Sequence, residues 1–183
     1  MLKEHNSKTK PITLLFDLET TPLTSRRKEI HCLVTMDYET GEITRYNDTG
    51  QTDPILRGVQ YLESADTIIG HNIIGFDLPV IKHIYPFFEP KGVIVDTLIL
   101  SRLYHADMLN TDRNAQHKGM PTKLYGRHSL ESYGYRLGEY KGNFGETSDW
   151  LEWSQEMEDY CEQDVIVTNK LCQHFQPYLT GFN

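Results

Sequence analysis

The sequence predicts an α/β fold in which helices cover both faces of a mixed sheet. Apolar runs of strand length alternate with segments of helical periodicity, and a hairpin follows the first of these runs. The chain has 183 residues, of which 38% are hydrophobic and 24% charged, and this suffices for one domain with a layered core. We expect a single domain at residues 11–183, preceded by a flexible polar tail at residues 1–10.

The first half of the chain contains the expected start of the sheet. The run ITLLF at residues 12–16 is continuously apolar, which is typical of a strand buried on both faces. Residues 30–37 and 42–46 flank a Glu-Thr-Gly turn and are expected to form an antiparallel hairpin. A helix follows, with Asp53 as its N-cap and Pro54 at its first position.

The second half alternates short strands with helices, which predicts helices on both sides of the sheet. Asp96 stands between an apolar run and a helical segment, where we expect it to cap the helix. The expected elements are, in order, a strand at 67–72, a helix at 76–85, a strand from 92 to Asp96, a helix at 97–105, a loop at 110–128, a helix at 129–136 and a long helix from about 150 to about 175.

Composition excludes several classes of protein. No run of about 18 apolar residues could cross a membrane, and no apolar segment follows the charged start as in a signal peptide, so we expect a cytoplasmic protein without a membrane partner. Cys32, Cys161 and Cys172 form no CxxC pair and are expected to be buried free thiols rather than a disulfide framework or a zinc site. The net charge of −8 argues against wrapping duplex DNA by charge alone, but carboxylates that hold two divalent cations would offset part of it.

Asp17 and Glu19 form the first of three candidate sites. They end the first strand, and the period of two directs both side chains to the same face of the sheet. Two like charges so close together favour a bound Mg²⁺ or Mn²⁺, since these ions prefer carboxylate oxygens. The alternative is an ordinary strand end that enters a polar loop, because this pattern is common in proteins.

The other two candidate sites also contribute carboxylates. Asp77 follows Asn72 and Phe76 in the first turn of a helix, where it is either a ligand or a simple cap. Asp164 lies one helical turn after Tyr160 in an apolar stripe, where a carboxylate is costly unless it is hydrogen-bonded or bound to a metal. If the three segments converge, four carboxylates can hold two divalent metal ions for phosphodiester hydrolysis, and Tyr160 can orient the attacking water.

Three motifs together resemble a known family. Asp17-Leu18-Glu19, then Asn72 with Phe76-Asp77, then Tyr160 with Asp164 resemble, in this order, the motifs of the DEDDy branch of the DnaQ-like 3′-to-5′ exonucleases. The similarity is greatest to the proofreading domain of the short family A DNA polymerases of bacteriophages, extends into residues 95–105 and 126–139, and covers residues 12–176. Tyrosine four residues before Asp164 indicates the DEDDy branch, because the histidine branch would have its histidine at Asp159.

The resemblance implies a ribonuclease-H-like (DnaQ-like) fold, with a five-stranded mixed sheet that has one antiparallel strand. It implies removal of 5′-mononucleotides from DNA 3′ ends. Asp17 would bridge two Mg²⁺ or Mn²⁺ ions, Glu19 and Asp164 would hold the ion that activates water, Asp77 would support the second ion, and Tyr160 would position the nucleophile. The expected substrate contacts are Leu18, His71, Asn72 and Phe76, although a histidine at a strand end is often structural.

Basic side chains gather at two places. The segment 110–128 has a single acid, Asp112, and we expect its four basic residues to guide the nucleic-acid strand; they are Arg113, Lys118, Lys123 and Arg127. The cluster of Arg26, Arg27 and Lys28 could contact the DNA backbone, but a solvated loop is favoured. His128 is compatible with either a structural or a functional role.

The favoured function is that of a metal-dependent exonuclease acting on single-stranded DNA or DNA 3′ ends, either free-standing or serving a DNA polymerase. One alternative is a 3′-to-5′ exoribonuclease, because the same carboxylates hydrolyse either backbone. Another is a non-catalytic module of the same fold that binds nucleic acid or a polymerase, which the intact carboxylate set opposes. The polar segment before the first strand favours a complete gene product, located in the host cytoplasm if a phage encodes it.

Overall fold

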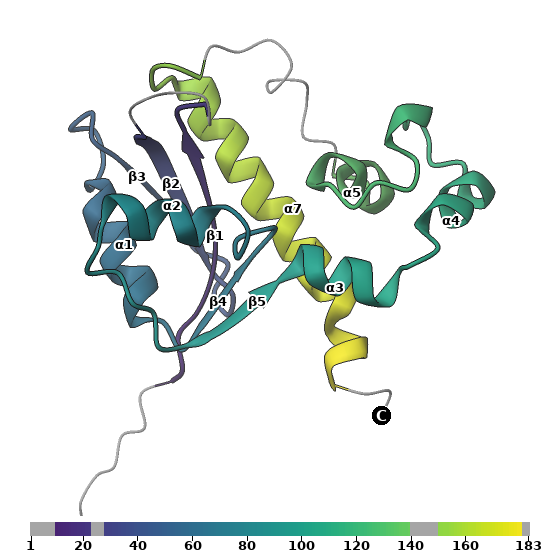
Figure 1. Ribbon diagram of the computed structural model, residues 1–183, viewed down its shortest axis with the longest axis horizontal. Helices are drawn as coiled ribbons and strands as arrows, with labels where there is room; N and C mark the ends of the chain where they lie inside the picture. The colour runs from purple at the N-terminus through teal and green to yellow at the C-terminus, as the bar shows by residue number, and fades with distance from the viewer. Residues whose placement is uncertain (1–9, 23–27, 140–149, 181–183) are drawn as a thin grey trace, which may run out of the picture.

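A computed structural model describes residues 10–22, 28–139 and 150–180 (Figure 1). Five strands form one sheet in the order β3-β2-β1-β4-β5. Strand β1 pairs antiparallel with β2 and parallel with β4, so β2 is the antiparallel strand of a mixed sheet, as predicted. The strands are β1 (Thr13–Thr20), β2 (Ile30–Asp37), β3 (Ile43–Asn47), β4 (Thr67–Gly70) and β5 (Val93–Asp96).

Helices cover both faces of this sheet, which confirms the predicted α/β class. In Figure 1, α1 and α2 lie on one face, α7 lies on the other, and α3, α4 and α5 extend beyond the β5 edge. The helices are α1 (Ile55–Ser64), α2 (Asp77–Ile84), α3 (Thr97–Tyr104), α4 (Met108–Ala115), α5 (Leu130–Leu137) and α7 (Gln155–Thr180), with the short 3-10 helix η1 (Thr122–Leu124) between α4 and α5.

Strand β1 is central, and its two faces pack against different layers. Leu14 and Phe16 are fully buried against α1 and α2, whereas Leu15 is fully buried on the α7 side. Since side chains alternate along a strand, Asp17 and Glu19 share the α7 side with Leu15. The strand thus delivers both carboxylates to one layer.

Helix α7 packs on two partners along its length. Its first half buries Met157, Cys161 and Val165 against the sheet. Its second half buries Leu171 and Phe175 against α4 and α5. The predicted start near residue 150 was too early, because the Ser154 hydroxyl accepts a hydrogen bond from the N–H of Met157 at 3.1 Å and thereby caps a helix that begins at Gln155.

Two further local predictions were wrong. Residues 110–128 are not one loop, since they contain most of α4 and all of η1; the buried face of α4 includes the carboxylate of Asp112, which hides the helical period. Asp53 does not cap α1, because the first N–H of that helix, from Ile55, donates to Oδ1 of Asp48 at 3.1 Å. The predicted cap of α3 is confirmed, since Asp96 accepts a hydrogen bond from the N–H of Leu98 at 2.9 Å.

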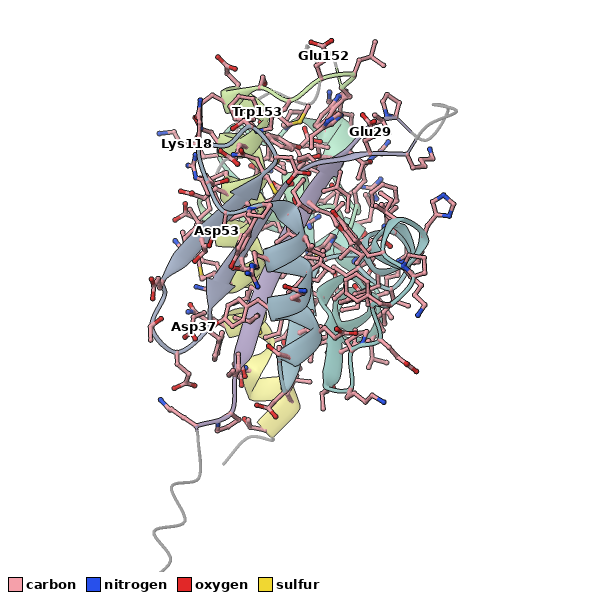
Figure 2. All side chains as sticks on the ribbon, turned by 90° about the vertical axis from the view of Figure 1, so that its left-hand side faces the viewer. Glu29, Asp37, Asp53, Lys118, Glu152 and Trp153 are labelled. Carbon is pink, nitrogen blue, oxygen red and sulfur yellow. The ribbon has the colours of Figure 1, made fainter. Side chains whose placement is uncertain are left out.

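Other expectations concern the ends and loops of the chain. In the predicted β2–β3 hairpin, Oδ1 of Asp37 (Figure 2) accepts the N–H groups of Glu39 and Thr40 at 2.9 and 2.8 Å. The expected tail falls mostly on residues 1–9, which lie outside the described residues, as do Arg26 and Arg27. Lys28 donates from Nζ to the carbonyl oxygen of Pro22 at 3.0 Å. All three cysteines are buried with free thiols, as predicted, and no helix within the described ranges has the length and apolar character of a membrane span.

Candidate active site

All three sequence motifs line one cavity of about 670 Å³. The cavity lies where β1 and the turn before α2 meet α7 and the α3–α5 region. The lining residues that were predicted from the motifs are Asp17, Leu18, Glu19, His71, Asn72, Phe76, Asp77, Tyr160 and Asp164. The remaining lining residues are Leu98, Arg102, Arg127, His128, Ser129, Leu130 and Trp150. The structure therefore brings together four carboxylates from three segments that are remote along the chain.

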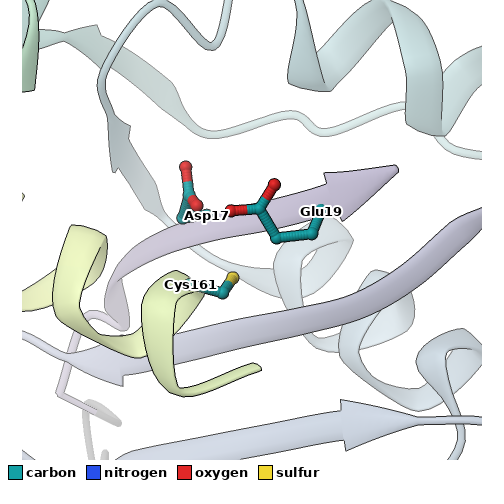
Figure 3. Close-up of side chains that lie close together, drawn as sticks. All are labelled: Asp17, Glu19 and Cys161. Carbon is teal, nitrogen blue, oxygen red and sulfur yellow. The ribbon is translucent and has the colours of Figure 1, made fainter. Parts of the chain in front are cut away.

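Asp17 and Glu19 lie side by side on β1, and the thiol of Cys161 from α7 lies next to them (Figure 3). The ligand atoms of these three residues are all within 4.8 Å of one another. Burial raises the pKa of the Cys161 thiol well above its usual range, and contact with Cys32 and the charges of Asp17 and Glu19 raise it further. The proximity of Cys161 to the two carboxylates was not predicted, although Cys161 lies one helical turn before Asp164 and so shares its face.

Asp77 connects the motifs electrostatically. Its side chain is only 4% exposed at the start of α2. Burial, together with the nearby charges of Asp96 and Asp164, raises its pKa to about 7, although hydrogen bonds from its own backbone and from the backbone of Leu18 act in the opposite direction. The cap interpretation accounts for the bond to its own backbone but not for the contacts with the other motifs.

Asp164 and Tyr160 face the cavity from α7. Asp164 is 6% exposed and lies between the apolar side chains that contact the sheet and those that contact α5. Tyr160 is half-buried, and the ring of Trp150 packs edge-on against it with the ring centroids 6.1 Å apart. Trp150 was not predicted to lie at the site, because no pattern in its own segment links it to the motifs.

Asp96 has a second role beyond capping α3. Its carboxylate accepts the N–H of Asn72 at 2.9 Å and the N–H of Ile74 at 3.1 Å. Asn72 has a φ of 63°, in the left-handed region, which ends β4 at Gly70, before the predicted end at residue 72. The buried Asp96 thus holds the turn that presents Asn72 to the cavity.

Each of the two histidines that line the cavity has a ring nitrogen within hydrogen-bond distance of a hydroxyl group. Nδ1 of His71 lies 2.9 Å from Oγ1 of Thr97, and Nδ1 of His128 lies 2.6 Å from Oγ of Ser101, which also contacts the hydroxyl of Tyr133. Burial lowers the pKa of His128, and the charges of Arg136 and Arg102 lower it further. His128 therefore remains uncharged at neutral pH.

The four basic residues of segment 110–128 differ in their relation to the cavity. Arg127 lines the cavity, whereas Arg113, Lys118 and Lys123 are exposed and do not line it. A second arginine at the cavity, Arg102 on α3, was not predicted. The available signal was its helical spacing, since Arg102 lies one turn after Leu98, another lining residue.

The chain is similar to known proteins both in sequence and in structure. A family model described as RNase H superfamily matches residues 14–176. The DNA-directed DNA polymerases of Enterobacteria phage T3 and Escherichia phage T7 are each 33% identical to this chain over 87% of its length, and the chain spans only 26% of either polymerase. These matches confirm the resemblance to the phage polymerases that the three motifs predicted.

Solved structures share the fold. Brucella melitensis NrnC superposes with a TM-score of 0.63 at 22% identity, covering 94% of this chain and 76% of NrnC, and NrnC has also been solved with Mg²⁺ and with pGG. The zinc-bound complex of Escherichia coli ExoI with single-stranded DNA superposes with a TM-score of 0.60 at 16% identity, covering 95% of this chain and 43% of ExoI.

Proposed function

The chain belongs to the RNase H superfamily, and on that premise we propose that it is a metal-dependent 3′-to-5′ exonuclease that removes 5′-mononucleotides from DNA. One observation carries the proposal: Asp17, Glu19, Asp77 and Asp164 line the same cavity as Tyr160. The similarity to phage DNA polymerases, over 26% of their length, supports single-stranded DNA or a 3′ end at a polymerase as the substrate.

The donor set of the cavity fits two divalent ions such as Mg²⁺ or Mn²⁺. Carboxylate oxygens are the ligands these ions prefer, and a cation would favour the ionised form of the buried Asp77 carboxyl, whose pKa burial and its acidic neighbours raise to about 7. Asp17, Glu19 and Asp164 would hold one ion, with Asp17 and Asp77 at the second. When bound, such ions supply Lewis acidity that activates water and offsets charge on the scissile phosphate.

The side chains around the carboxylates bind and orient the reactants. The Tyr160 hydroxyl, one helical turn from Asp164, positions the attacking water. Leu18 and Phe76 offer apolar surface to the terminal nucleotide, and Asn72 offers its amide from a turn that Asp96 fixes. His71, which directly follows β4, contacts the nucleic-acid strand.

The strand guide proposed for segment 110–128 has two parts. Arg127 acts at the cavity itself. The exposed side chains of Arg113, Lys118 and Lys123 attract the nucleic-acid strand from a greater distance, because the single acid of their segment, Asp112, is fully buried in an ion pair with Arg136.

The test is release of mononucleotides from a 3′-labelled single-stranded oligodeoxynucleotide with Mg²⁺ or Mn²⁺. We expect Asp17→Ala to lower the rate by roughly 10²-fold to 10³-fold or more, since it removes a carboxylate from the centre of the cavity. The matched control is Asp53→Ala, because Asp53 is exposed and lies outside the cavity. Equal release by the wild type and Asp17→Ala would refute the proposal, and a matched oligoribonucleotide would show which backbone is preferred.

A further inference from the structure

We propose that Arg102 and Arg127 form a clamp for backbone phosphates on the α3–α5 side of the cavity, and that the buried Asp112–Arg136 ion pair positions Arg127 there. This inference rests on the proposed nuclease function, because it assigns the contacts that hold the strand while the carboxylates act. It adds one binding residue that the sequence did not predict, Arg102, and one positioning pair that lies outside the cavity.

The charge of the cavity calls for such a clamp. Four carboxylates line it, and two bound divalent ions would offset their charge at the scissile phosphate but would leave the neighbouring backbone phosphates of the strand without a cationic partner. Within the described residues, Arg102 and Arg127 are the arginines that line the cavity, and neither is ion-paired with a carboxylate there. Both side chains are exposed, so their planar guanidinium groups can donate two parallel hydrogen bonds to a phosphate.

Hydrogen bonds hold Arg127 and the residue before it in place. Its carbonyl oxygen accepts from Nη2 of Arg136 at 2.8 Å, and its own Nε donates to the carbonyl oxygen of Lys123 at 2.8 Å. The preceding N–H, from Gly126, donates to Oδ2 of Asp112 at 2.8 Å. Asp112 and Arg136 thus hold the peptide groups on both sides of residues 126 and 127, at the place where Arg127 lines the cavity.

The ion pair that makes these contacts is itself rigid. Nε and Nη2 of Arg136 donate to the two carboxylate oxygens of Asp112 at 2.8 and 2.7 Å. Asp112 is fully buried, the side chain of Arg136 is 6% exposed, and the guanidinium stacks over the ring of Tyr133 at 4.8 Å. The pair therefore joins α4, which carries Asp112, to α5, which carries Arg136.

Gly126 provides a second, independent constraint on this turn. Its φ is +74°, a conformation that other residues rarely adopt, and an added Cβ would lie 3.1 Å from Cβ of Leu109 on α4. A side chain at position 126 would press on Leu109 and displace the turn while leaving both members of the ion pair in the sequence. Arg102, by contrast, is carried by α3, and among the described residues it is not a hydrogen-bond or ion-pair partner of Asp112 or Arg136, so the two halves of the clamp can be perturbed separately.

The experiment measures binding without turnover. A fluorescein-labelled single-stranded oligodeoxythymidylate is titrated with each full-length variant in EDTA, and anisotropy gives Kd over a range of salt concentrations. We expect Arg102→Ala and Arg127→Ala each to raise Kd roughly tenfold and to lower the salt slope by about 0.7 per lost phosphate contact. Arg57→Ala is the control, because Arg57 is an exposed arginine on α1, away from the cavity.

A double-mutant cycle tests the positioning role. Arg136→Lys keeps the charge but not the planar fork of the guanidinium, and Gly126→Ala strains the turn. Each substitution should weaken binding on its own. Its effect should be absent in the Arg127→Ala background and fully additive with that of Arg102→Ala. In Mg²⁺, KM should rise with kcat within about twofold, since the lost interaction is binding. Thermal unfolding verifies that each variant is folded.

The outcomes are distinct. Binding by Arg102→Ala and Arg127→Ala equal to that of Arg57→Ala, or no binding by the wild type, overturns the clamp. Full additivity of both Arg136→Lys and Gly126→Ala with Arg127→Ala overturns the positioning role, and if Arg136→Lys does not fold, Gly126→Ala decides alone. Weakened binding by the clamp variants together with no hydrolysis by the wild type supports the clamp while it refutes the proposed nuclease function.

Discussion

The two sides of the cavity are built by different physical means. On the carboxylate side, β1 and α7 hold Asp17, Glu19 and Asp164 by packing of apolar side chains that are fully buried around them. On the arginine side, a polar network holds Arg127, with the Asp112–Arg136 pair at its centre. Carboxylates that repel one another are thus held together by the packing of apolar side chains around them, whereas an exposed cationic group is held by hydrogen bonds.

The largest effect is expected when the buried carboxylate on the arginine side is removed. Asp112→Ala leaves Arg136 charged and largely buried, so we expect the free energy of unfolding in urea to fall by about 3–5 kcal/mol. Burial opposes ionisation of Asp112, but Arg136 and the N–H of Gly126 outweigh it and lower the pKa, so this stabilisation is also lost in acid. Asp53→Ala, which removes an exposed carboxylate outside the cavity, is the control and should change stability by less than about 0.5 kcal/mol. A loss no larger than that of the control would contradict the account.

The carboxylate side should respond in the opposite direction. In the metal-free protein, Asp77 has a folded-state pKa near 7, raised by burial from 3.8, so the folded state keeps a proton that the unfolded state releases between these values. Wild-type stability should therefore fall as pH rises over this interval. Asp77→Asn mimics the protonated form and should be more stable by roughly 2–4 kcal/mol at about pH 8, with little difference near pH 4. Urea unfolding in EDTA at several pH values measures this, and an unchanged pH dependence in the variant would count against it.

The smallest effect is expected from the exposed basic residues on the arginine side. Replacing Arg113, Lys118 and Lys123 together by Ala should weaken binding of single-stranded DNA by about threefold or less at physiological salt, because exposed charges act through screened attraction. Adding Arg127→Ala should then weaken binding further and flatten the salt dependence. Anisotropy titrations at several salt concentrations compare the two variants. An unchanged salt slope after all four substitutions would eliminate the strand guide.

Much of the fold could be predicted because its signals are local. The continuous apolar run of β1 and the single carboxylate in the apolar stripe of α7 both stand out against their surroundings, and they located Asp17 and Asp164 correctly in strand and helix. The five-stranded mixed sheet came from the resemblance of the motifs, and the structure confirms it. Strand and helix periods indicated which faces carry Asp17, Glu19 and Asp164, whereas Asp77 stayed open between a cap and a ligand until the motifs were considered together.

The missed features depend on partners that are distant in sequence. Asp112 pairs with Arg136, 24 residues later, so α4 shows a charge where an amphipathic helix would show an apolar residue. Asp48 reaches Ile55, seven residues later, which displaced the predicted cap. Periodicity reports which face of an element is buried, but it does not report which charge will neutralise another across the fold.

Helix α7 contacts both layers, because its first half packs against the sheet and its second half packs in the α3–α5 layer. One continuous helix of 26 residues therefore sets the spacing between the carboxylate side and the arginine side of the cavity. A substitution that shifts α7 along the sheet would move its own carboxylate relative to both β1 and α5, so the width of the cavity depends on the packing of a single helix.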